Sequence, residues 1–367
     1  MGLRQLFDEP AQRQERAELP ILRALIQRYA TERPFLGRAV VFGHLLVRNS
    51  MVVVEALWRG GAEIVLCRAH PSPAEAPLLH DLQRHAIPVL EVDRAVIAGE
   101  WFLDVGAVLG RRRVPRGAAE VTRTGVLHYQ HIVCPVISAD DCRSKRIEGF
   151  FGTGEGFVRA WRQLRPSDPL EGQNAIVFGF GKIGRGVAHQ LRRVPMQVTV
   201  AEADDRARQR AEQEGFAVVA ALPDDRLQQA LAQADVVISV TGRPGVIGAT
   251  YPPDWFRRRR MVLVNLGAED EFGAPFGDDE ILGGRHLPLN FHLAQPTLNR
   301  FVDAPLAAHL LALEALVRQP ERWPPGVHAL PVEMDAWVVH AWRAAWPNED
   351  LTGIGEELGL EDGPMGS

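Results

Sequence analysis

The sequence predicts an α/β protein of two domains, and three observations support this. Its 367 residues are too many for one compact core. Short apolar, β-branched runs alternate with amphipathic helical stretches in two separate blocks, which is typical of parallel sheets covered by helices on both faces. The composition, 46% hydrophobic and 24% charged, is that of a globular protein with enough apolar material for two cores.

The first block covers residues 19–150 and follows a polar lead-in at residues 1–18. It begins with helical periodicity over residues 19–29. Helices at 45–59 and 78–85 alternate with apolar runs that are typical of buried strands. The predicted strands are residues 39–43, 62–67, 87–92 and 100–106.

The second block covers residues 166–305. A helix at 151–164 leads into it and ends at the breaker sequence RPSDP. The predicted strands are residues 174–179, 197–202, 216–220, 235–242 and 261–267, and the helices are 183–193, 204–214 and 224–233. A long amphipathic helix at 305–318 is expected to return to the first domain. Residues 306–340 would then complete that domain, and residues 341–367 would form a C-terminal tail.

Charge and cysteine usage limit the partners. The formal net charge is -5 and neither block has a large basic excess, which argues against nucleic acid or an acidic membrane as partner. No apolar run approaches the ~18 residues that a membrane span needs, and the charged N-terminus lacks an apolar signal core. The three separated cysteines form no C-x-x-C pair, so we expect a reducing, cytoplasmic compartment and no metal site.

A glycine-rich turn follows the first strand of the second block. Its G-x-G-x-x-G pattern stands between a strand and a helix, as a dinucleotide-binding turn requires. The first glycine permits the tight turn, the second lets the backbone approach a pyrophosphate, and the third lets helix and strand pack closely. The helix N-terminus presents free N–H groups to the phosphates. We expect the whole turn to bind the cofactor: Gly179, Phe180, Gly181, Lys182, Ile183 and Gly184.

An acidic residue ends the next strand. Glu202 stands 18 residues after the last glycine of the turn, where a carboxylate accepts hydrogen bonds from the ribose hydroxyls. The same charge would repel a 2′-phosphate, so NAD is favoured over NADP. Thr241, Gly242, Leu266 and Gly267 follow two later strands, at the carboxyl ends where an open α/β sheet places its ligand. The second block is therefore predicted to be a Rossmann NAD-binding domain.

From about residue 20 to residue 340 the chain resembles the S-adenosylhomocysteine hydrolase family. The most specific segments are CPVISADDCRSKRIEGFFGTGEGFVRAW (134–161), GFGKIGRG, DVVISVTGRPGVIG (235–248), VLVNLGAEDEFG (262–273), LPLNFHLAQP (287–296) and VHALPVEMD (327–335). The resemblance implies that the first domain holds a substrate, that the Rossmann domain keeps NAD bound, and that the protein is a homodimer or homotetramer. It also implies a redox-assisted elimination: a sugar hydroxyl is oxidised, the neighbouring proton and the 5′ substituent leave, water adds, and the hydride returns.

The resemblance carries over to single residues only in part. His44 matches the family's first-domain histidine, which favours a role in the site. The alternative is that it is only a loop or core residue. Lys145 matches the lysine beside the sugar hydroxyls, which can take a proton once its pKa is lowered, or is a solvated residue at a helix start. Glu148 replaces an aspartate that binds the sugar, and Asp104 lies near a matched aspartate, although Val105 is the stricter match. We expect a catalytic role for His44, Asp104, Lys145 and Glu148. Thr122, Thr124 and Asn290 match residues that touch the cofactor.

At other positions the chain departs from the family. Ala268 and Gln295 stand where the family has histidines, and Gly149 replaces an asparagine next to the sugar-binding aspartate. Arg48 occupies a position that helps to hold adenine. Arg48 and Arg123 point to an anionic ligand, because arginine forks suit carboxylate or phosphate, or else are surface or salt-bridged residues.

Three interpretations of the function remain open. The favoured one is an NAD-dependent enzyme that uses the same cycle of oxidation and elimination, ending in dehydration or hydrolysis, on a modified nucleoside or related polyol. The second is a simple NAD-dependent dehydrogenase. The third is a non-catalytic NAD-binding paralogue that regulates a partner. True S-adenosylhomocysteine hydrolysis is the least favoured, because the residues that would hold adenosine and homocysteine are changed.

Overall fold

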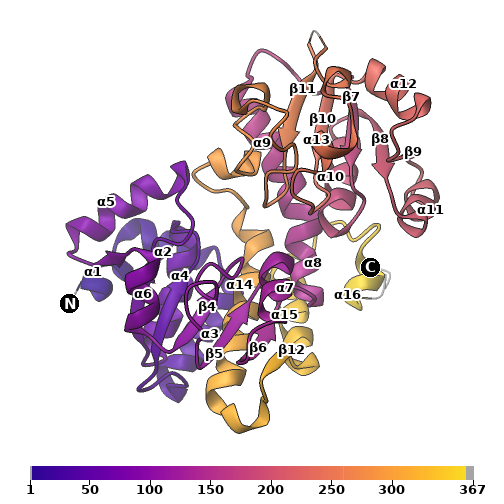
Figure 1. Cartoon of the computed structure of the whole chain (residues 1–367). Helices are drawn as coiled ribbons and strands as arrows, with labels where there is room; N and C mark the ends of the chain where they lie inside the picture. The colour runs from indigo at the N-terminus through magenta and orange to yellow at the C-terminus, as the bar shows by residue number, and fades with distance from the viewer. Residues whose placement is uncertain (1, 259, 361–367) are drawn as a thin grey trace. The chain divides into compact units, whose positions relative to one another are not determined.

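A computed structural model describes residues 2–258 and 260–360 and divides them into two compact units. Within the described residues, unit 1 comprises residues 2–148 and 298–360, and unit 2 comprises residues 149–297. Each unit is built on a parallel β-sheet with helices packed on it (Figure 1). The predicted α/β class with two parallel sheets is confirmed.

The sheet of unit 1 is doubly wound. Its strands are β1 (Ala39–Gly43), β2 (Glu63–Cys67), β3 (Val89–Leu90), β4 (Trp101–Asp104), β5 (Gly117–Glu120), β6 (Pro135–Ser138) and β12 (Gly326–Ala329). They lie in the order β12-β6-β5-β4-β1-β2-β3, and every described pair is parallel. From β1 the chain adds β2 and β3 on one side of that strand and then crosses to add β4 on its other side. The topological switch point therefore lies between β1 and β4. In an open α/β sheet, ligands bind beside the carboxyl ends of the strands at such a point.

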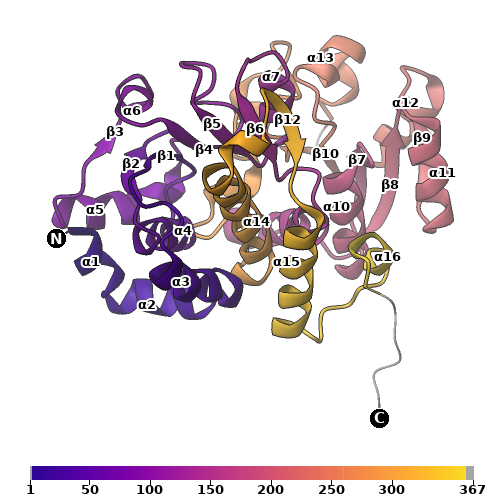
Figure 2. The same cartoon turned by 90° about the horizontal axis from the view of Figure 1, so that it is seen from below.

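Helices cover both faces of this sheet. They are α1 (Gly2–Phe7), α2 (Pro10–Ala17), α3 (Pro20–Glu32), α4 (Arg48–Arg59), α5 (Ala76–Arg84), α6 (Val92–Ala98), α7 (Arg123–Tyr129), α8 (Arg143–Ile147), α14 (Asn299–Arg318), α15 (Val332–Ala345) and α16 (Gly355–Leu358). The longest, α14, has 20 residues and is buried along most of its length. It packs against α3, α15, β5 and β6, as Figures 1 and 2 show. The buried polar residues of α14, among them Asp303 and His309, are therefore held in a rigid, dry setting.

Unit 2 has the Rossmann strand order. Its strands are β7 (Asn174–Phe178), β8 (Gln197–Glu202), β9 (Ala217–Ala220), β10 (Val236–Ser239) and β11 (Val262–Asn265), and its helices are α9 (Thr153–Leu164), α10 (Lys182–Arg193), α11 (Asp205–Gln213), α12 (Asp225–Gln233) and α13 (Val246–Thr250). The strands lie in the order β11-β10-β7-β8-β9, all parallel. The switch point lies between β7 and β10, where a dinucleotide crosses the sheet.

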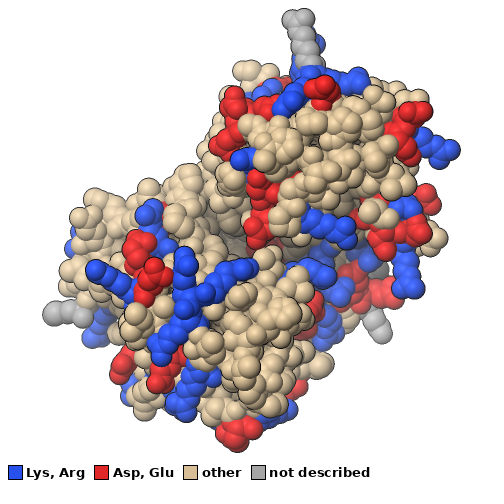
Figure 3. All heavy atoms as spheres, viewed as in Figure 1, with Lys and Arg blue, Asp and Glu red and all other residues tan. Residues whose placement is uncertain are grey.

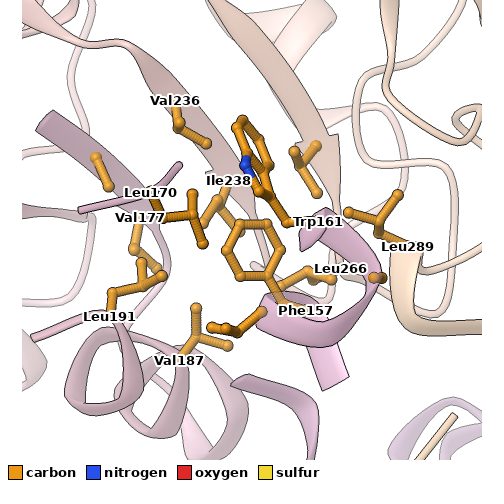
Figure 4. Packing of buried hydrophobic residues seen from close by; sticks show 14 of the residues in the cluster. Phe157, Trp161, Leu170, Val177, Val187, Leu191, Val236, Ile238, Leu266 and Leu289 are labelled. Atoms are coloured by element: carbon orange, nitrogen blue, oxygen red, sulfur yellow. The ribbon is translucent and has the colours of Figure 1, made fainter. Parts of the chain in front are cut away.

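One hydrophobic cluster fixes α9 and α10 on this sheet. Phe157 and Trp161 lie one turn apart on α9 and reach the same face, as residues four apart do. Figure 4 shows them packed among Val187, Ile238 and Leu289. The indole N–H of Trp161 donates to the Asp168 carbonyl at 2.6 Å, so the ring is buried without an unsatisfied donor. This packing fixes the position of α10 on the sheet, and with it the position of the glycine-rich turn that leads into α10.

Three strands of unit 1 were not predicted. β5 (GAAE) has no β-branched residue, β6 starts with a proline, and β12 follows two prolines, so none carries the apolar signal of a buried strand. Conversely, the strand expected at 87–92 is limited to the two residues of β3. Burial by neighbouring strands, which local sequence does not reveal, decides these cases.

The two ends of the chain contain more structure than expected. The lead-in at residues 1–18 contains α1 and α2, whose Leu6, Phe7 and Gln12 are buried. Within the expected tail, α16 buries Gly355 and Leu358 on unit 1. Residues 361–367 of that tail lie outside the described residues.

The surface carries charges of both signs. Figure 3 shows Lys and Arg interspersed with Asp and Glu on the face in view. Many arginines pair with carboxylates, for example Arg16 with Glu55 and Arg257 with Glu280. In the described part of the chain no helix is long and apolar enough to cross a membrane.

Candidate functional site

The three glycines of the glycine turn (residues 179–184) of unit 2 differ in the space around them. Gly179 has φ 98°, a left-handed conformation that favours glycine, and a Cβ there would lie 2.7 Å from the Val240 carbonyl oxygen. A Cβ on Gly184 would collide with the Gly179 carbonyl oxygen. A Cβ on Gly181 would meet no atom within 4 Å. The first and third glycines are thus required by the fold, and the second leaves open space where a phosphate can approach the backbone.

Glu202 ends β8 beside this turn. Its carboxylate accepts hydrogen bonds from the amides of Phe180 at 2.6 Å, Ala203 at 2.6 Å and Asp204 at 2.9 Å. The side chain therefore lies over the glycine turn, at the strand end where a carboxylate accepts from the ribose hydroxyls of NAD. Lys182 begins α10, and Ile183 follows with 37% of its surface exposed.

A buried glutamate that the sequence analysis did not single out organises the other side of the switch point. Glu271 is fully buried and accepts from the amides of Thr241 at 2.7 Å and Gly242 at 2.6 Å, and from the Thr241 hydroxyl at 2.9 Å. A Cβ on Gly267 would collide with the Glu271 carboxylate, so Gly267 makes room for it. Leu266, between these loops, is buried. Glu271 thus fixes the turn formed by Thr241 and Gly242.

Asn290 provides an unsatisfied polar atom in unit 2. Its side chain is 2% exposed, and its Nδ2 donates to the Pro296 carbonyl at 3.2 Å. Its Oδ1 is buried without a hydrogen-bond partner among the described residues. A buried acceptor without a donor is costly, and a carboxamide N–H of nicotinamide is a donor of the required kind. Together with the open space at Gly181, this atom indicates that the residues of unit 2 fit NAD.

In unit 1, His44 follows β1 directly and so lies at the switch point of that sheet. It is 8% exposed, and its ring stacks on Phe42 with centroids 5.1 Å apart. Its Nε2 lies 2.8 Å from Nδ1 of His309, a fully buried residue of α14. Burial, with smaller contributions from His309, His70 and Lys145, holds the pKa of His44 well below its usual range. The imidazole is therefore neutral at neutral pH.

Lys145 and Glu148 form an ion pair next to this histidine. Lys145 Nζ contacts Glu148 Oε2, and both side chains are largely buried. Although burial acts to lower the pKa of Lys145, the carboxylates of Glu148, Asp140 and Glu120 outweigh it and the pKa is raised. The expectation of a lysine with a lowered pKa is wrong for the protein without ligand. Lys145 is an ammonium group, which donates hydrogen bonds and protons.

Contacts on both sides of Lys145 in the sequence fix the position of α8, the helix that carries it. Asp335 of α15 accepts from the amides of Arg143 at 2.9 Å and Ser144 at 3.0 Å, and so caps the N-terminus of α8. Glu148 begins a π-helix (Glu148–Gly152), an irregular turn that is frequent at functional sites. Lys145 bonds to Glu148 Oε2, and among the described residues no hydrogen bond reaches Glu148 Oε1, so that oxygen is available to a substrate hydroxyl.

Lysine itself is rare in this chain. Lys and Arg together number 41, and lysine stands only at positions 145 and 182. Where a cation only pairs with a carboxylate the chain uses arginine, as in the pairs of Arg159 with Glu155 and Arg165 with Asp168. An ammonium can release a proton at accessible pH and a guanidinium cannot. A lysine in the cluster around His44 therefore suits proton transfer better than simple charge pairing.

Asp104 does not have the contacts of a catalytic acid or base. It is fully buried, and its carboxylate accepts from the amides of Val105, Leu109 and Gly110 and from the Tyr129 hydroxyl at 2.7 Å. Burial raises its pKa to about 6. Its hydrogen bonds hold the loop after β4 and tie it to Tyr129 of α7, so the contacts favour a structural role and do not support the predicted catalytic one.

Thr122 differs from its expected role in the same way. Its hydroxyl donates to Glu120 Oε1 at 2.7 Å, and accepts from the amides of Gly106 at 3.0 Å and Gly125 at 3.1 Å as the N-cap of α7. The hydroxyl is fully used inside unit 1, so its contacts do not support binding of a cofactor. Thr124, in the first turn of α7, is half-buried. Glu120 itself is buried on loop amides, and burial raises its pKa to about 8.

The two arginines proposed to bind an anion have different settings. Arg48 pairs with Asp81, which also accepts from Arg84 at 3.0 Å. This shared carboxylate offsets part of the charge of Arg48, while Arg48 Nη1 is buried without a hydrogen-bond partner among the described residues. Arg123 lies exposed at the start of α7. Among the described residues, no group of three or more His, Cys, Asp and Glu side chains is arranged to hold a metal ion.

His309 and His70 complete the cluster and were not found from the sequence. His70 follows β2, and its Nε2 lies 3.0 Å from the Val105 carbonyl oxygen. His309 is the single histidine in the apolar run LAAHLLALEALV, which reads as ordinary core helix. We call the group His44, His70, Lys145, Glu148 and His309 the polar cluster of unit 1.

The strand order and the glycine turn define the class: this is a Rossmann-domain protein, and its second unit binds NAD. Residues 159–271 match the family model described as S-adenosyl-L-homocysteine hydrolase, NAD binding domain. The adenosylhomocysteinase of Nostoc sp. strain PCC 7120 is 27% identical, over 87% of this chain and 85% of that protein. The S-inosyl-L-homocysteine hydrolase of Methanopyrus kandleri is 26% identical, over 87% of this chain and 86% of that protein.

These similarities run through both units, and the chain is a divergent relative of the adenosylhomocysteinases. Among solved structures, the chain is similar to a dipicolinate synthase chain from Bacillus halodurans, with a TM-score of 0.44 and 14% identity, over 75% of this chain and 98% of that one.

Proposed function

We propose that this protein is an NAD-dependent enzyme that oxidises a sugar hydroxyl transiently, and so drives elimination from a modified nucleoside or related polyol. The net reaction is hydrolysis or dehydration. The single observation that carries the proposal is the polar cluster of unit 1, where a neutral histidine, His44, lies beside the lysine ammonium of Lys145. A neutral imidazole accepts a proton and an ammonium donates one, so the cluster contains both partners that an elimination needs.

Unit 2 supplies the cofactor site. NAD held in this site would supply reversible hydride transfer at a carbinol carbon of the substrate. The glycine turn would hold the pyrophosphate, Glu202 the adenosine ribose, and Asn290 the nicotinamide carboxamide. Because the hydride returns, no external oxidant is consumed.

The residues of unit 1 would move the protons. His44 takes the proton from the carbon next to the oxidised position, and that carbon's electron pair expels the substituent one carbon further on. Lys145 donates a hydrogen bond to the sugar oxygen, where negative charge develops, and its ammonium is the source of the proton that the expelled substituent takes up. Glu148 accepts from a neighbouring hydroxyl through its free oxygen. Addition of water to the double bond then gives hydrolysis. Where the expelled substituent is a hydroxyl, release of the unsaturated product without that addition gives dehydration.

Two observations support the proposed substrate class: the names of the relatives and the positions at which this chain differs from the family. The two relatives are named for substrates built on different nucleosides, adenosine and inosine, so the base of the nucleoside is a point of variation. At positions where the family has histidines, Ala268 is exposed and the Gln295 carbonyl accepts from Arg159 at 2.8 Å. We therefore propose a nucleoside or sugar other than S-adenosylhomocysteine, and a homodimer or homotetramer as the resemblance implies.

Solvent exchange tests the proposal directly. The purified protein, loaded with NAD, is incubated in D₂O with a panel of nucleosides and thioether or alkyl derivatives of their 5′ position. We expect deuterium at the 4′ carbon of a turned-over substrate, with no net accumulation of NADH. Stoichiometric NADH without deuterium uptake would instead identify a simple dehydrogenase. Tight NAD with neither signal for any member of the panel would contradict the proposal.

A further inference from the structure

The direction of one hydrogen bond in the polar cluster can be deduced from its neighbour. His309 Nε2 lies 2.9 Å from the carbonyl oxygen of Ala119, at the end of β5. A carbonyl oxygen only accepts, so His309 Nε2 must carry a proton. Burial lowers the pKa of His309 to about 4, so the ring is neutral and has one proton. Its Nδ1 is therefore an acceptor.

The same deduction extends to His44. His44 Nε2 lies 2.8 Å from His309 Nδ1, and two lone pairs at that distance would repel each other. His44 Nε2 must therefore donate. A neutral His44 has no second ring proton, so its Nδ1 holds a lone pair. Among the described residues no side chain or backbone group bonds to His44 Nδ1.

We propose that His309 is a positioning residue, which fixes His44 as the Nε2–H tautomer and so presents His44 Nδ1 as the proton acceptor. Only one part of the inference rests on the proposed function, namely that His44 Nδ1 accepts a proton from a substrate. The direction of the two hydrogen bonds follows from the contacts with Ala119 and between the two rings, together with the burial that keeps both rings neutral, and does not depend on the proposed function.

The surroundings make His309 a rigid support. It lies in the middle of α14, is fully buried, and is held by the main chain of β5 at its other nitrogen. His44 is held from the opposite side by the stacked ring of Phe42, with 16° between the ring planes. The titratable groups that face His44 are His309 from α14, His70 from the loop after β2, and Lys145 from α8. Burial and the neighbouring ammonium of Lys145 both oppose a second proton on His44.

The tautomer of His44 and its hydrogen bond to His309 can be observed by NMR on the protein with neither substrate nor added cofactor. The chain has 12 histidines, and selective ¹⁵N labelling makes their ring nitrogens visible. We expect a protonated His44 Nε2, an unprotonated His44 Nδ1, and a scalar coupling across the hydrogen bond between His44 Nε2 and His309 Nδ1. A proton on His44 Nδ1, or the absence of that coupling, would overturn the inference.

Variants separate positioning from packing. His309→Leu removes the acceptor, so the His44 Nε2 proton should exchange faster with water and the proton-abstraction rate should fall about 100-fold. His309→Gln should restore both, because an amide can accept from His44 through oxygen and donate to Ala119 through nitrogen. Leu313→Ala, one turn further along α14 in the same core, destabilises the fold but should leave the His44 signals unchanged.

These outcomes differ from those that test the proposed function. If the coupling is present and no substrate exchanges deuterium, only the proposed function fails. If deuterium is exchanged while His44 carries its proton on Nδ1, only the role of His309 fails. Equal effects of His309→Leu and Leu313→Ala on the His44 Nε2 proton would also refute that role.

Discussion

The Glu202 carboxylate bonds to the turn that it is expected to assist: its Oε2 atom lies 2.6 Å from the amide nitrogen of Phe180. The acid thus holds the glycine turn in the conformation that a dinucleotide needs, before any ribose is bound. A charge-assisted hydrogen bond of this kind contributes roughly 1.5–3 kcal/mol. The same residue would serve both the shape of the turn and the selection of the ribose.

Replacing that acid should therefore weaken NAD binding. Glu202→Gln keeps the size of the side chain but removes the charge, and we expect an affinity for NAD at least about 10-fold lower by calorimetry. The preference for NAD over NADP should shrink as well, because no carboxylate would repel the 2′-phosphate. Asp205→Asn, an exposed acid three residues further on, is the matched control and should change neither. Equal affinities for Glu202→Gln and the wild type would disprove the role.

Two glycines of the turn should respond differently to the same methyl group. Gly181→Ala meets no atom within 4 Å, and its backbone, with φ -74° and ψ -164°, suits alanine. We expect a protein with an unchanged melting temperature that has lost most of its NAD affinity, because the methyl occupies the approach of the pyrophosphate. Gly184→Ala should unfold more readily, since its methyl collides with the Gly179 carbonyl. Normal NAD binding by a folded Gly181→Ala would contradict the cofactor site.

The charge on Lys145 depends on its partner. The Glu148 carboxylate raises the pKa of Lys145 through charge and a hydrogen bond, so Glu148→Gln should lower that pKa. Reductive ¹³C-methylation labels only the two lysines and the N-terminal amine, so each signal can be titrated separately. Glu155→Gln removes a carboxylate that pairs with Arg159 and should leave the Lys145 titration in place. A pKa that does not fall in Glu148→Gln would remove the basis for treating the two residues as a unit.

Local sequence could predict the elements whose signal is local. The strands of unit 2 are β-branched runs, so β7 and β8 were predicted to within a residue, and the glycine turn identified the cofactor. β5 could not be predicted, because GAAE is a strand only by virtue of its neighbours β4 and β6.

The residues of the candidate site also differ in whether local sequence could predict them. His44 could be found because it ends a predicted strand. His309 could not, because it is 265 residues away and a lone histidine in an apolar helix has no local signature. Asp104 ends β4 and Thr122 follows β5, but only the packing shows that their oxygens bind amides of the loop after β4. A polar residue at a strand end is thus a candidate from sequence, and its hydrogen bonds decide between ligand and loop.

Asp303 should make the stability of the protein depend on pH. It is fully buried on α14 and accepts from the amides of Ile21 at 2.8 Å and Leu22 at 3.0 Å, in the first turn of α3. Burial raises its pKa to about 7, from 3.8 in a solvated chain, although the two amides act to lower it. The folded state therefore binds the proton more tightly than the unfolded state between about pH 4 and pH 7. In that window the contribution of Asp303 to the free energy of unfolding falls as pH rises.

Asp303→Asn removes this titration while keeping an acceptor for α3. Relative to the variant, the wild type should lose free energy of unfolding between about pH 4 and pH 7, by at most about 4 kcal/mol. Urea unfolding at several pH values measures the difference directly. Comparison with the variant is needed because Glu120 acts in the same direction and His44 and His309 in the opposite one. Leu306→Ala, on the same helix, should lower stability equally at every pH, and parallel curves for wild type and Asp303→Asn would show that Asp303 does not titrate in this range.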